Sequence, residues 1–214
     1  MRYIIFPVTA LLAYFIAGVN PSIMLSKLIY KKDIRLLGSG NPGFTNFKRS
    51  LGGKFAWLVF LLDVLKGSVI SVIAGSLFGK YFGSWQFGVA FASFFGVIGH
   101  CFPVLYGFNG GKGFLVCFSS LFFIDGLAGA VAAAVLVILL LTVRYMSLST
   151  LAALAAGLVC IILLGYPVTV CIFESAAVAI VFVRHRKNIK RLINREEPKF
   201  GFGHNGSEAK EAKE

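Results

Sequence analysis

Long apolar runs alternate with short polar stretches along almost the whole chain. Each run has about the length that a helix needs to cross the ~30 Å hydrocarbon layer of a bilayer. The pattern predicts seven membrane segments, at residues 3–26, 54–78, 85–106, 110–124, 126–142, 148–165 and 167–183. The fourth, fifth and seventh are short for a full crossing, so five or six crossings also fit. Because helices satisfy their own backbone hydrogen bonds in lipid, we expect an all-α integral membrane protein with about seven transmembrane helices and short, glycine-rich cytoplasmic loops.

The composition excludes an ordinary soluble domain. Hydrophobic residues occupy 57% of the 214 positions and charged residues only 14%, whereas a soluble domain carries about a quarter charged residues. The four cysteines lie in apolar runs without paired spacing, so we expect buried thiols and neither disulfides nor metal ligands.

Basic residues are concentrated at residues 27–54 and after residue 183. Cytoplasmic loops collect Lys and Arg, so both regions are expected inside, with the N-terminus outside and an odd number of crossings. Only Arg2 and Lys80 then lie outside. This topology, together with contact with anionic lipid, explains the net charge of +12. We therefore expect no nucleic-acid partner.

The chain is expected to form a single polytopic membrane domain at residues 1–199, followed by a disordered cytoplasmic tail at residues 200–214. Residues 1–17 carry one Arg before an apolar run, as a signal peptide does, but no cleavage pattern follows. We interpret them as the first membrane helix.

The first polar cluster is "GSGNPGFTN" at residues 38–46, with Arg49 shortly after it. Glycines let a backbone turn sharply and bring its N–H groups close to a ligand, and successive amides of this kind form an anion-binding concavity. Ser39, Asn41, Thr45 and Asn46 add polar side chains. An ordinary Gly-Asn-Pro turn is the alternative interpretation.

The second polar cluster is "GHCFPVLYGFNGGKGF" at residues 99–114. Its Gly-Gly-Lys-Gly run resembles a phosphate loop but is not a Walker A motif, because Gly113 stands where Ser or Thr would hold magnesium. Lys112 offers a positive charge beside glycine amides. A short topogenic turn is the alternative, although His100 and Pro103 just upstream favour a site.

The third polar cluster follows the last apolar run and carries seven basic and two acidic residues between Arg184 and Lys199. A helix here would present an apolar stripe of Ile189, Leu192 and Ile193 to the membrane surface. Most of the basic residues fit a positive-inside flank. His185 and Asn188, three positions apart, are not needed for that purpose.

Charged residues also interrupt the apolar runs. Asp63 and Lys66 lie one helical turn apart, where an ion pair would lower the cost of placing either charge in lipid. They are interpreted either as a structural pair or as support for a site. Ser147 adds a hydroxyl near the same membrane face, and Glu174 has no evident partner.

The three clusters resemble one family, the acyl-phosphate-dependent glycerol-3-phosphate acyltransferases of bacteria, often called PlsY. The resemblance covers roughly residues 10–197. The family's motifs are Ser-Gly-Asn-x-Gly-x-Thr-Asn, Gly-His-x-Phe-Pro-Val with Gly-Gly-Lys-Gly, His-x-x-Asn-Ile-x-Arg-Leu and Asp-Val-Leu-Lys-Gly, and they match residues 39–46, 99–104 with 110–113, 185–192 and 63–67.

The resemblance implies transfer of a fatty acyl group from acyl phosphate to the 1-hydroxyl of glycerol 3-phosphate, in the cell (inner) membrane of a bacterium. It implies no cofactor and membrane lipid as surroundings. We expect a monomer, although the sequence itself does not show the oligomeric state. The acyl-phosphate head group would be held by Ser39, Gly40, Asn41, Gly43, Thr45 and Asn46. Glycerol 3-phosphate would be held by Arg49, Lys112, Ser147, His185 and Asn188. Catalysis would fall to Ser39, Lys112 and His185, with support from Asp63, Lys66, His100, Gly110, Gly111 and Gly113.

Three departures from the family's pattern concern affinity and chain length more than the reaction. Asn109 stands where members often have Lys. The first helix carries Gly18-Val19-Asn20-Pro21 in place of Gly-Ser-Ile-Pro, and the bulky Phe44 replaces a small residue.

Two questions stay open in the sequence. The proton of the attacking hydroxyl can go to His185 or to a substrate phosphate oxygen. A transporter or channel for a small phosphorylated anion, or a lipid-binding scaffold, is the rival class. The His-x4-Asp relay of other acyltransferases is missing, because Leu105 and Lys190 stand five positions after His100 and His185.

Overall fold

A computed structural model describes residues 2–201 of the chain, so the expected tail lies outside the described residues from position 202 onward. Within the described range the regular structure is helical, with 3-10 turns at Arg2–Ile4, Ile34–Leu36 and Val104–Tyr106. Its α-helices are α1 (Ile5–Gly18), α2 (Pro21–Tyr30), α3 (Phe44–Leu51), α4 (Ala56–Phe82), α5 (Trp85–Cys101), α6 (Phe114–Ile124), α7 (Gly126–Thr142), α8 (Met146–Leu163), α9 (Val168–Arg184) and α10 (Arg186–Ile193).

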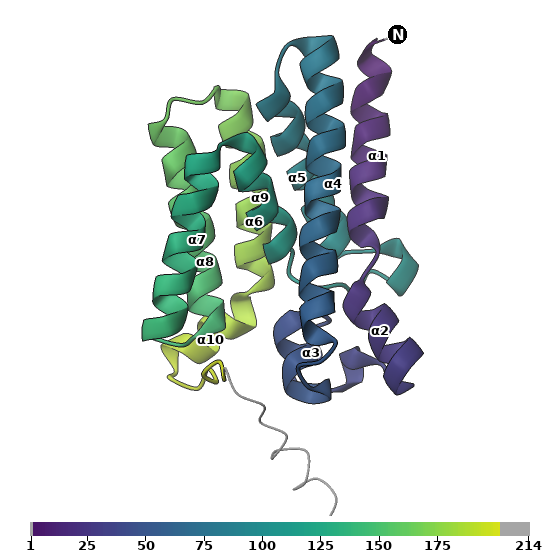
Figure 1. Ribbon diagram of the computed structural model, residues 1–214, viewed down its shortest axis with the longest axis vertical. Coiled ribbons are helices and arrows are strands. Elements are labelled where there is room, and N and C mark those ends of the chain that lie inside the picture. Colours follow the sequence, from purple (N-terminus) through teal and green to yellow (C-terminus); the bar gives the residue numbers. More distant parts are fainter. Residues whose placement is uncertain (1, 202–214) are drawn as a thin grey trace, which may run out of the picture.

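The long helices run side by side, and α5 lies at their centre, in contact with α1, α4, α6 and α9 (Figure 1). A hairpin of α7 and α8 packs beside α6 and α9. The N-terminus lies at one end of the bundle, whereas the short helices α2, α3 and α10 gather at the other end (Figure 1). The three polar clusters therefore meet at one end of the molecule, opposite the N-terminus.

All seven predicted segments contain an apolar helix, although not all are long enough to cross. Four stretches meet the length and hydropathy of a membrane span: Arg2–Tyr30, Ala56–Phe82, Trp85–Tyr106 and Met146–Leu163. α9 makes a fifth when it is counted with α10 across a bend of 60°. We treat α9 as the spanning part, because α10 is short and rich in charge. The 11 residues of α6 cover only roughly 17 Å at the usual helical rise.

Two of the predicted segments are interrupted inside their expected bounds. Segment 3–26 breaks at Val19 and Asn20, because Pro21 cannot continue a helix and suits the first turn of a new one. The Asn20 side chain caps α2 by accepting a hydrogen bond from the Ile23 N–H at 2.9 Å. Segment 110–124 becomes helical only at Phe114, because Gly113 takes a left-handed φ of 83°.

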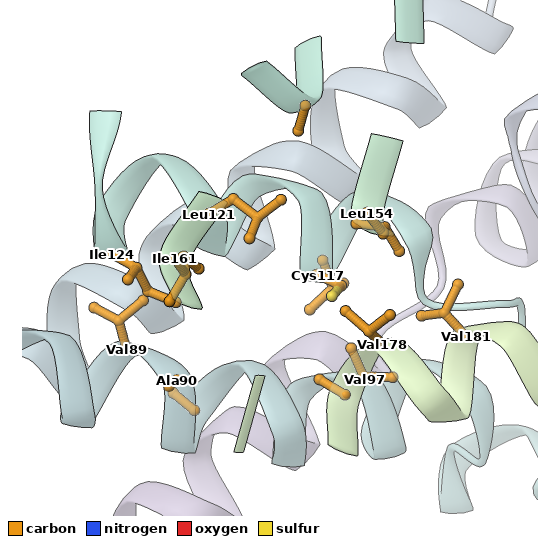
Figure 2. Close-up of a cluster of buried hydrophobic side chains, with 14 of the residues drawn as sticks. Val89, Ala90, Val97, Cys117, Leu121, Ile124, Leu154, Ile161, Val178 and Val181 are labelled. Atoms are coloured by element: carbon orange, nitrogen blue, oxygen red, sulfur yellow. The ribbon is translucent and has the colours of Figure 1, made fainter. Parts of the chain in front are cut away.

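The apolar core lies where α5, α6, α8 and α9 meet, and it consists of small and branched side chains such as Val97, Leu121, Leu154 and Val178 (Figure 2). Glu174, for which the sequence offers no partner, lies fully buried beside this core. Its Oε1 accepts hydrogen bonds from the Ser120 hydroxyl and the Cys117 thiol of α6 at 3.2 and 3.3 Å. The neighbouring helix thus supplies polar partners for one of the two carboxyl oxygens, whereas Oε2 has no hydrogen-bond partner in the described part of the chain.

The ordered chain extends past the predicted limit at residue 199. The C-terminal strap, residues 196–201, runs back from α10 across the polar end of the bundle. Phe200 is buried, its N–H donates to the Arg144 carbonyl at 2.6 Å, and Lys48 donates to the Gly201 carbonyl at 2.7 Å. The strap therefore joins α3 to the turn between α7 and α8.

Candidate active site

Two connected hollows open at the polar end of the bundle. The inner one, the cavity, has a volume of about 270 Å³, and the outer one, the vestibule, about 630 Å³. Side chains of all three polar clusters line both, namely Ser39, Asn41, Lys112, Asn188 and Arg191. These residues therefore mark the passage between an outer polar space and an inner, mostly apolar one.

The predicted site residues converge here. The cavity is lined by Ser39, Asn41, Gly43, Thr45, Asn46, Arg49, Asp63, His100, Lys112, Gly113, Ser147, His185 and Asn188. Gly40 and Gly110 line only the vestibule. Lys66 and Gly111 line neither the cavity nor the vestibule.

The loop at residues 38–46 is shaped by Asn46. The Asn46 Oδ1 accepts the Ser39 N–H at 2.9 Å, and its Nδ2 donates to the carbonyls of Leu37 and Ile34 at 3.0 and 3.3 Å. Asn46 is almost fully buried. Its side-chain amide is thus engaged inside the loop, which points to holding the loop's shape more than to direct ligand contact.

Helix N-termini without side-chain caps open into the cavity. α3 begins at Phe44 after an extended Gly43, and α6 begins at Phe114 after Gly113; neither has a capping side chain. The residues of both first turns line the cavity. α8 also begins there uncapped, at Met146. The unbonded N–H groups and the positive end of the helix dipole make such termini anion-binding sites.

The loop at residues 110–113 departs from the expectation of exposed glycine amides. Gly110 and Gly111 donate their N–H groups to the carbonyls of Cys101 and His100, at 3.2 and 3.1 Å. Arg184 binds the carbonyls of the same two glycines at 2.9 and 3.1 Å. Both peptide groups are therefore engaged from two sides, and the loop acts as a fixed support for Lys112.

Lys112 lies in the passage between the vestibule and the cavity. Burial lowers the pKa of its ammonium to about 8, opposed by the nearby Glu197 carboxylate and assisted by surrounding arginines. Its Nζ donates to the Asn188 Oδ1. Arg49 lies at the cavity edge and has no hydrogen bond or ion pair with another residue in the described part of the chain. Among the basic side chains that line the cavity, Lys112 is therefore fixed and Arg49 is available.

Glu197 is a central residue of the site that the sequence reasoning missed. Its Oε1 accepts the Ser147 hydroxyl at 2.7 Å and the Asn188 amide at 2.6 Å, and its Oε2 accepts the Arg191 Nε at 2.6 Å. Although burial opposes ionisation, these hydrogen bonds outweigh it and lower the pKa of Glu197. The carboxylate thus ties α8, α10 and the strap together behind Lys112. In the sequence Glu197 is one of two acidic residues in a basic run, and nothing there indicates this role.

His185 lies at the junction of α9 and α10, beyond the end of the spanning helix. Its Nδ1 is 2.8 Å from the Val181 carbonyl, which can only accept, so Nδ1 carries the proton and Nε2 is the unprotonated nitrogen. Burial and then the neighbouring Lys112 charge lower the pKa of His185 to about 4. The ring is therefore neutral at physiological pH and offers a hydrogen-bond acceptor.

The apolar part of the cavity faces the membrane. It is walled by Phe44 of α3, Trp57 and Phe60 of α4, and Leu136 and Leu140 of α7. Trp57 is 60% exposed on the outer surface of the bundle. The cavity therefore joins an apolar side, open at the outer surface of the bundle, to a polar side at Lys112.

Replacing Glu197 by Gln is expected to lower the free energy of unfolding by roughly 1.5–3 kcal/mol, the range for hydrogen bonds to a charged group. The amide would place an N–H against donors from Ser147, Asn188 or Arg191. Denaturant unfolding of purified protein in detergent measures this. The control is Glu196→Gln at the exposed neighbouring position, and equal effects of both variants would contradict the network's role.

Comparisons with known proteins agree with this arrangement. The sequence profile of a family described as glycerol-3-phosphate acyltransferase matches residues 7–195. A glycerol-3-phosphate acyltransferase of Jannaschia sp. (strain CCS1) is 37% identical over 90% of this chain and 92% of its own. One of Aquifex aeolicus (strain VF5) is 35% identical over 88% and 95%.

Solved structures extend the likeness to the fold. The crystal structure of PlsY, an integral membrane glycerol 3-phosphate acyltransferase, in its glycerol 3-phosphate form superposes with a TM-score of 0.84 at 33% identity, covering 92% of this chain and 96% of that one. The lysophosphatidic acid form gives a TM-score of 0.79 at 34% identity over 92% and 95%. The helical membrane fold predicted from the sequence is confirmed, and the chain belongs to the PlsY-type family of glycerol-3-phosphate acyltransferases.

Proposed function

We propose that this acyltransferase takes its acyl group from acyl phosphate and transfers it to the 1-hydroxyl of glycerol 3-phosphate. The products are 1-acylglycerol 3-phosphate and inorganic phosphate. One observation carries the proposal: uncapped helix N-termini, Lys112 and Arg49 meet at the inner end of an apolar slot that opens to lipid. Two phosphate groups and one acyl chain fit such a site, and the activated donor needs neither nucleotide nor metal.

The acyl-phosphate head group is assigned to the N-terminus of α3. Its donors are the open amides of the first helical turn, with Ser39, Asn41 and Thr45 beside them. Asn46 keeps this loop in shape. The acyl chain then lies in the apolar slot between α4 and α7.

Glycerol 3-phosphate is assigned to the passage between vestibule and cavity. The vestibule carries the basic side chains of Arg35, Lys112, Arg184, Arg186, Lys187 and Arg191 against the single carboxylate of Asp33, and such a field attracts a dianion. Lys112 and Arg49 bind its phosphate. Ser147, His185 and Asn188 contact the glycerol, with His185 Nε2 accepting from a hydroxyl.

The transfer step is a displacement at the acyl carbonyl. The glycerol hydroxyl oxygen bonds to the carbonyl carbon, the bond from that carbon to the phosphate oxygen breaks, and phosphate leaves. A base with the pKa of His185, about 4, is weak. We therefore assign the hydroxyl proton to an oxygen of the donor phosphate, with positioning and charge stabilisation as the protein's contribution.

The site lies at the end of the bundle that carries the basic clusters. By the positive-inside rule we assign this end to the cytoplasm and the N-terminus to the outside of a bacterial inner membrane. All proposed site residues come from one chain, which fits a monomer with residues 1–199 as one membrane domain.

The direct test is phosphate release by purified protein in detergent, given palmitoyl phosphate with and without glycerol 3-phosphate. We expect release that depends on glycerol 3-phosphate and falls ten- to a hundredfold in Lys112→Ala, since a charge-assisted bond contributes roughly 1.5–3 kcal/mol. Lys80→Ala, at the far end of α4, is the control. A folded sample without release would contradict acyl phosphate as the donor.

The charge of Lys112 predicts a pH dependence. Because burial lowers the pKa of the free lysine to about 8, kcat/KM for glycerol 3-phosphate should fall as the pH rises through about 8. Rates at pH 6.5–9.5, corrected for spontaneous hydrolysis of the donor, measure this. Lys112→Arg stays charged, so its profile should lack this fall even if its maximum is lower. The same fall in both proteins would assign it to another group.

Replacing His185 by Asn separates the two candidates for the base, because Asn can still donate to Val181 but cannot take the proton. If His185 only binds the glycerol, KM for glycerol 3-phosphate should rise and kcat should stay within about tenfold of wild type. Loss of a general base would lower kcat by roughly 10²–10⁴. Steady-state kinetics with both substrates varied give the answer.

A further inference from the structure

Three buried polar side chains at the inner part of the site have no role in the proposed chemistry, and we call them the polar chain. Lys66 and Asp63 of α4 form an ion pair at 2.8 Å, and the Nδ1 of His100, on α5, lies 3.8 Å from the same Asp63 oxygen. All three are at most 8% exposed. Such a group is costly in a membrane bundle, so its placement calls for a physical reason.

One end of this polar chain reaches the break in the first span. Lys66 Nζ donates to the Val19 carbonyl at 2.8 Å, a group that the interrupted helix leaves open. The next residue, Asn20, donates from its Nδ2 to the Pro42 carbonyl at 3.1 Å. Lys66 thus fixes the peptide group between Val19 and Asn20, and the Asn20 side chain holds the loop at residues 38–46.

The other end reaches the loop that carries Lys112. The His100 carbonyl accepts the Gly111 N–H at 3.1 Å. The His100 ring lies directly against Gly111, where an added Cβ would come within 2.2 Å of Nε2. The ring and carbonyl of His100 therefore set the position of Gly111, and Arg184 closes the loop from the opposite side.

Asp63 lies between the two ends. Its Oδ1 pairs with Lys66 at 2.8 Å, and the His100 Nδ1 lies 3.8 Å from the same oxygen, a packing contact beyond hydrogen-bond distance. Asp63 and His100 also line the cavity between the two loops. We propose that Lys66, Asp63 and His100 are positioning residues that fix the separation between the loop at 38–46 and the loop at 110–113. The inference rests on the proposed function, in which the first loop holds acyl phosphate and the second holds glycerol 3-phosphate.

The proposal predicts a graded pattern of KM changes. His100→Asn, which empties the space under Gly111, should raise KM for glycerol 3-phosphate more than KM for acyl phosphate. Lys66→Met should raise KM for acyl phosphate more than KM for glycerol 3-phosphate, and Asp63→Asn should raise both KM values. Changes of about tenfold are expected, since misplacement by about 1 Å can cost a hundredfold. A reduced folded fraction would lower the measured kcat without moving either KM.

The double variant Asp63→Asn/Lys66→Met separates positioning from charge balance. It restores neutrality, so its melting temperature should recover towards wild type while both KM values stay raised. Wild-type KM values in the double variant and in His100→Asn would overturn the proposal. Should the double variant fail to fold, the milder His100→Asn decides alone through its KM values.

Two controls separate this inference from the proposed function. Glu174→Gln removes another buried carboxyl group that contacts neither loop, and its KM values should stay within about twofold of wild type. Lys112→Ala tests the glycerol 3-phosphate site itself. An unchanged KM for glycerol 3-phosphate in Lys112→Ala would contradict the assignment of that site. If that KM rises in Lys112→Ala but both KM values are unchanged in the variants of Lys66, Asp63 and His100, only the positioning role is contradicted.

Discussion

The half-buried charge of Lys112 is the constraint on which the rest of the site depends. An ammonium group removed from water is costly, and burial accordingly lowers the pKa of Lys112. The structure offsets this cost through Asn188, which accepts from Lys112 while donating to Glu197. Glu197 in turn is held ionised by Ser147 and Arg191. The lysine is thus kept ready for an anion without a carboxylate bound directly to it, which would compete with a phosphate.

Helix breaks supply the remaining donors. A membrane bundle tolerates open backbone groups only where they line a polar cavity, and this one places the starts of α3, α6 and α8 around a single hollow. The break in the first span serves the same end, because its open Val19 carbonyl receives Lys66 and its Asn20 reaches the loop before α3. Interruptions of the apolar pattern therefore build the part of the fold that carries the proposed site.

Sequence reasoning located the apolar helices and the three clusters because both leave local signals, in hydropathy and in motif spacing. It placed the predicted polar and glycine residues near one face but could not assign their contacts. Asn46 turned out to bind its own loop, and Gly110 and Gly111 use their amides on α5. The role of Glu197 was missed because it depends on how the chain after α10 folds back onto α8, and the partners of Glu174 were missed because they lie on another helix. Residues 200 and 201 of the strap were assigned to the tail because the sequence after Phe200 is polar, although Phe200 is buried.

The side chains that depart from the family pattern lie on the wall, at the entrance and at the helix break. Phe44 contributes its backbone to the start of α3, while its ring packs against Trp57, Phe60 and Phe200 on the slot wall. Asn109 lines the vestibule and not the cavity. Asn20 stands at the helix break where the family has Ile. Its side chain caps α2 and donates to the Pro42 carbonyl. Because the donors at the cavity are mainly backbone groups and the fixed Lys112, the wall and the entrance can vary in sequence while the chemistry at the centre is preserved.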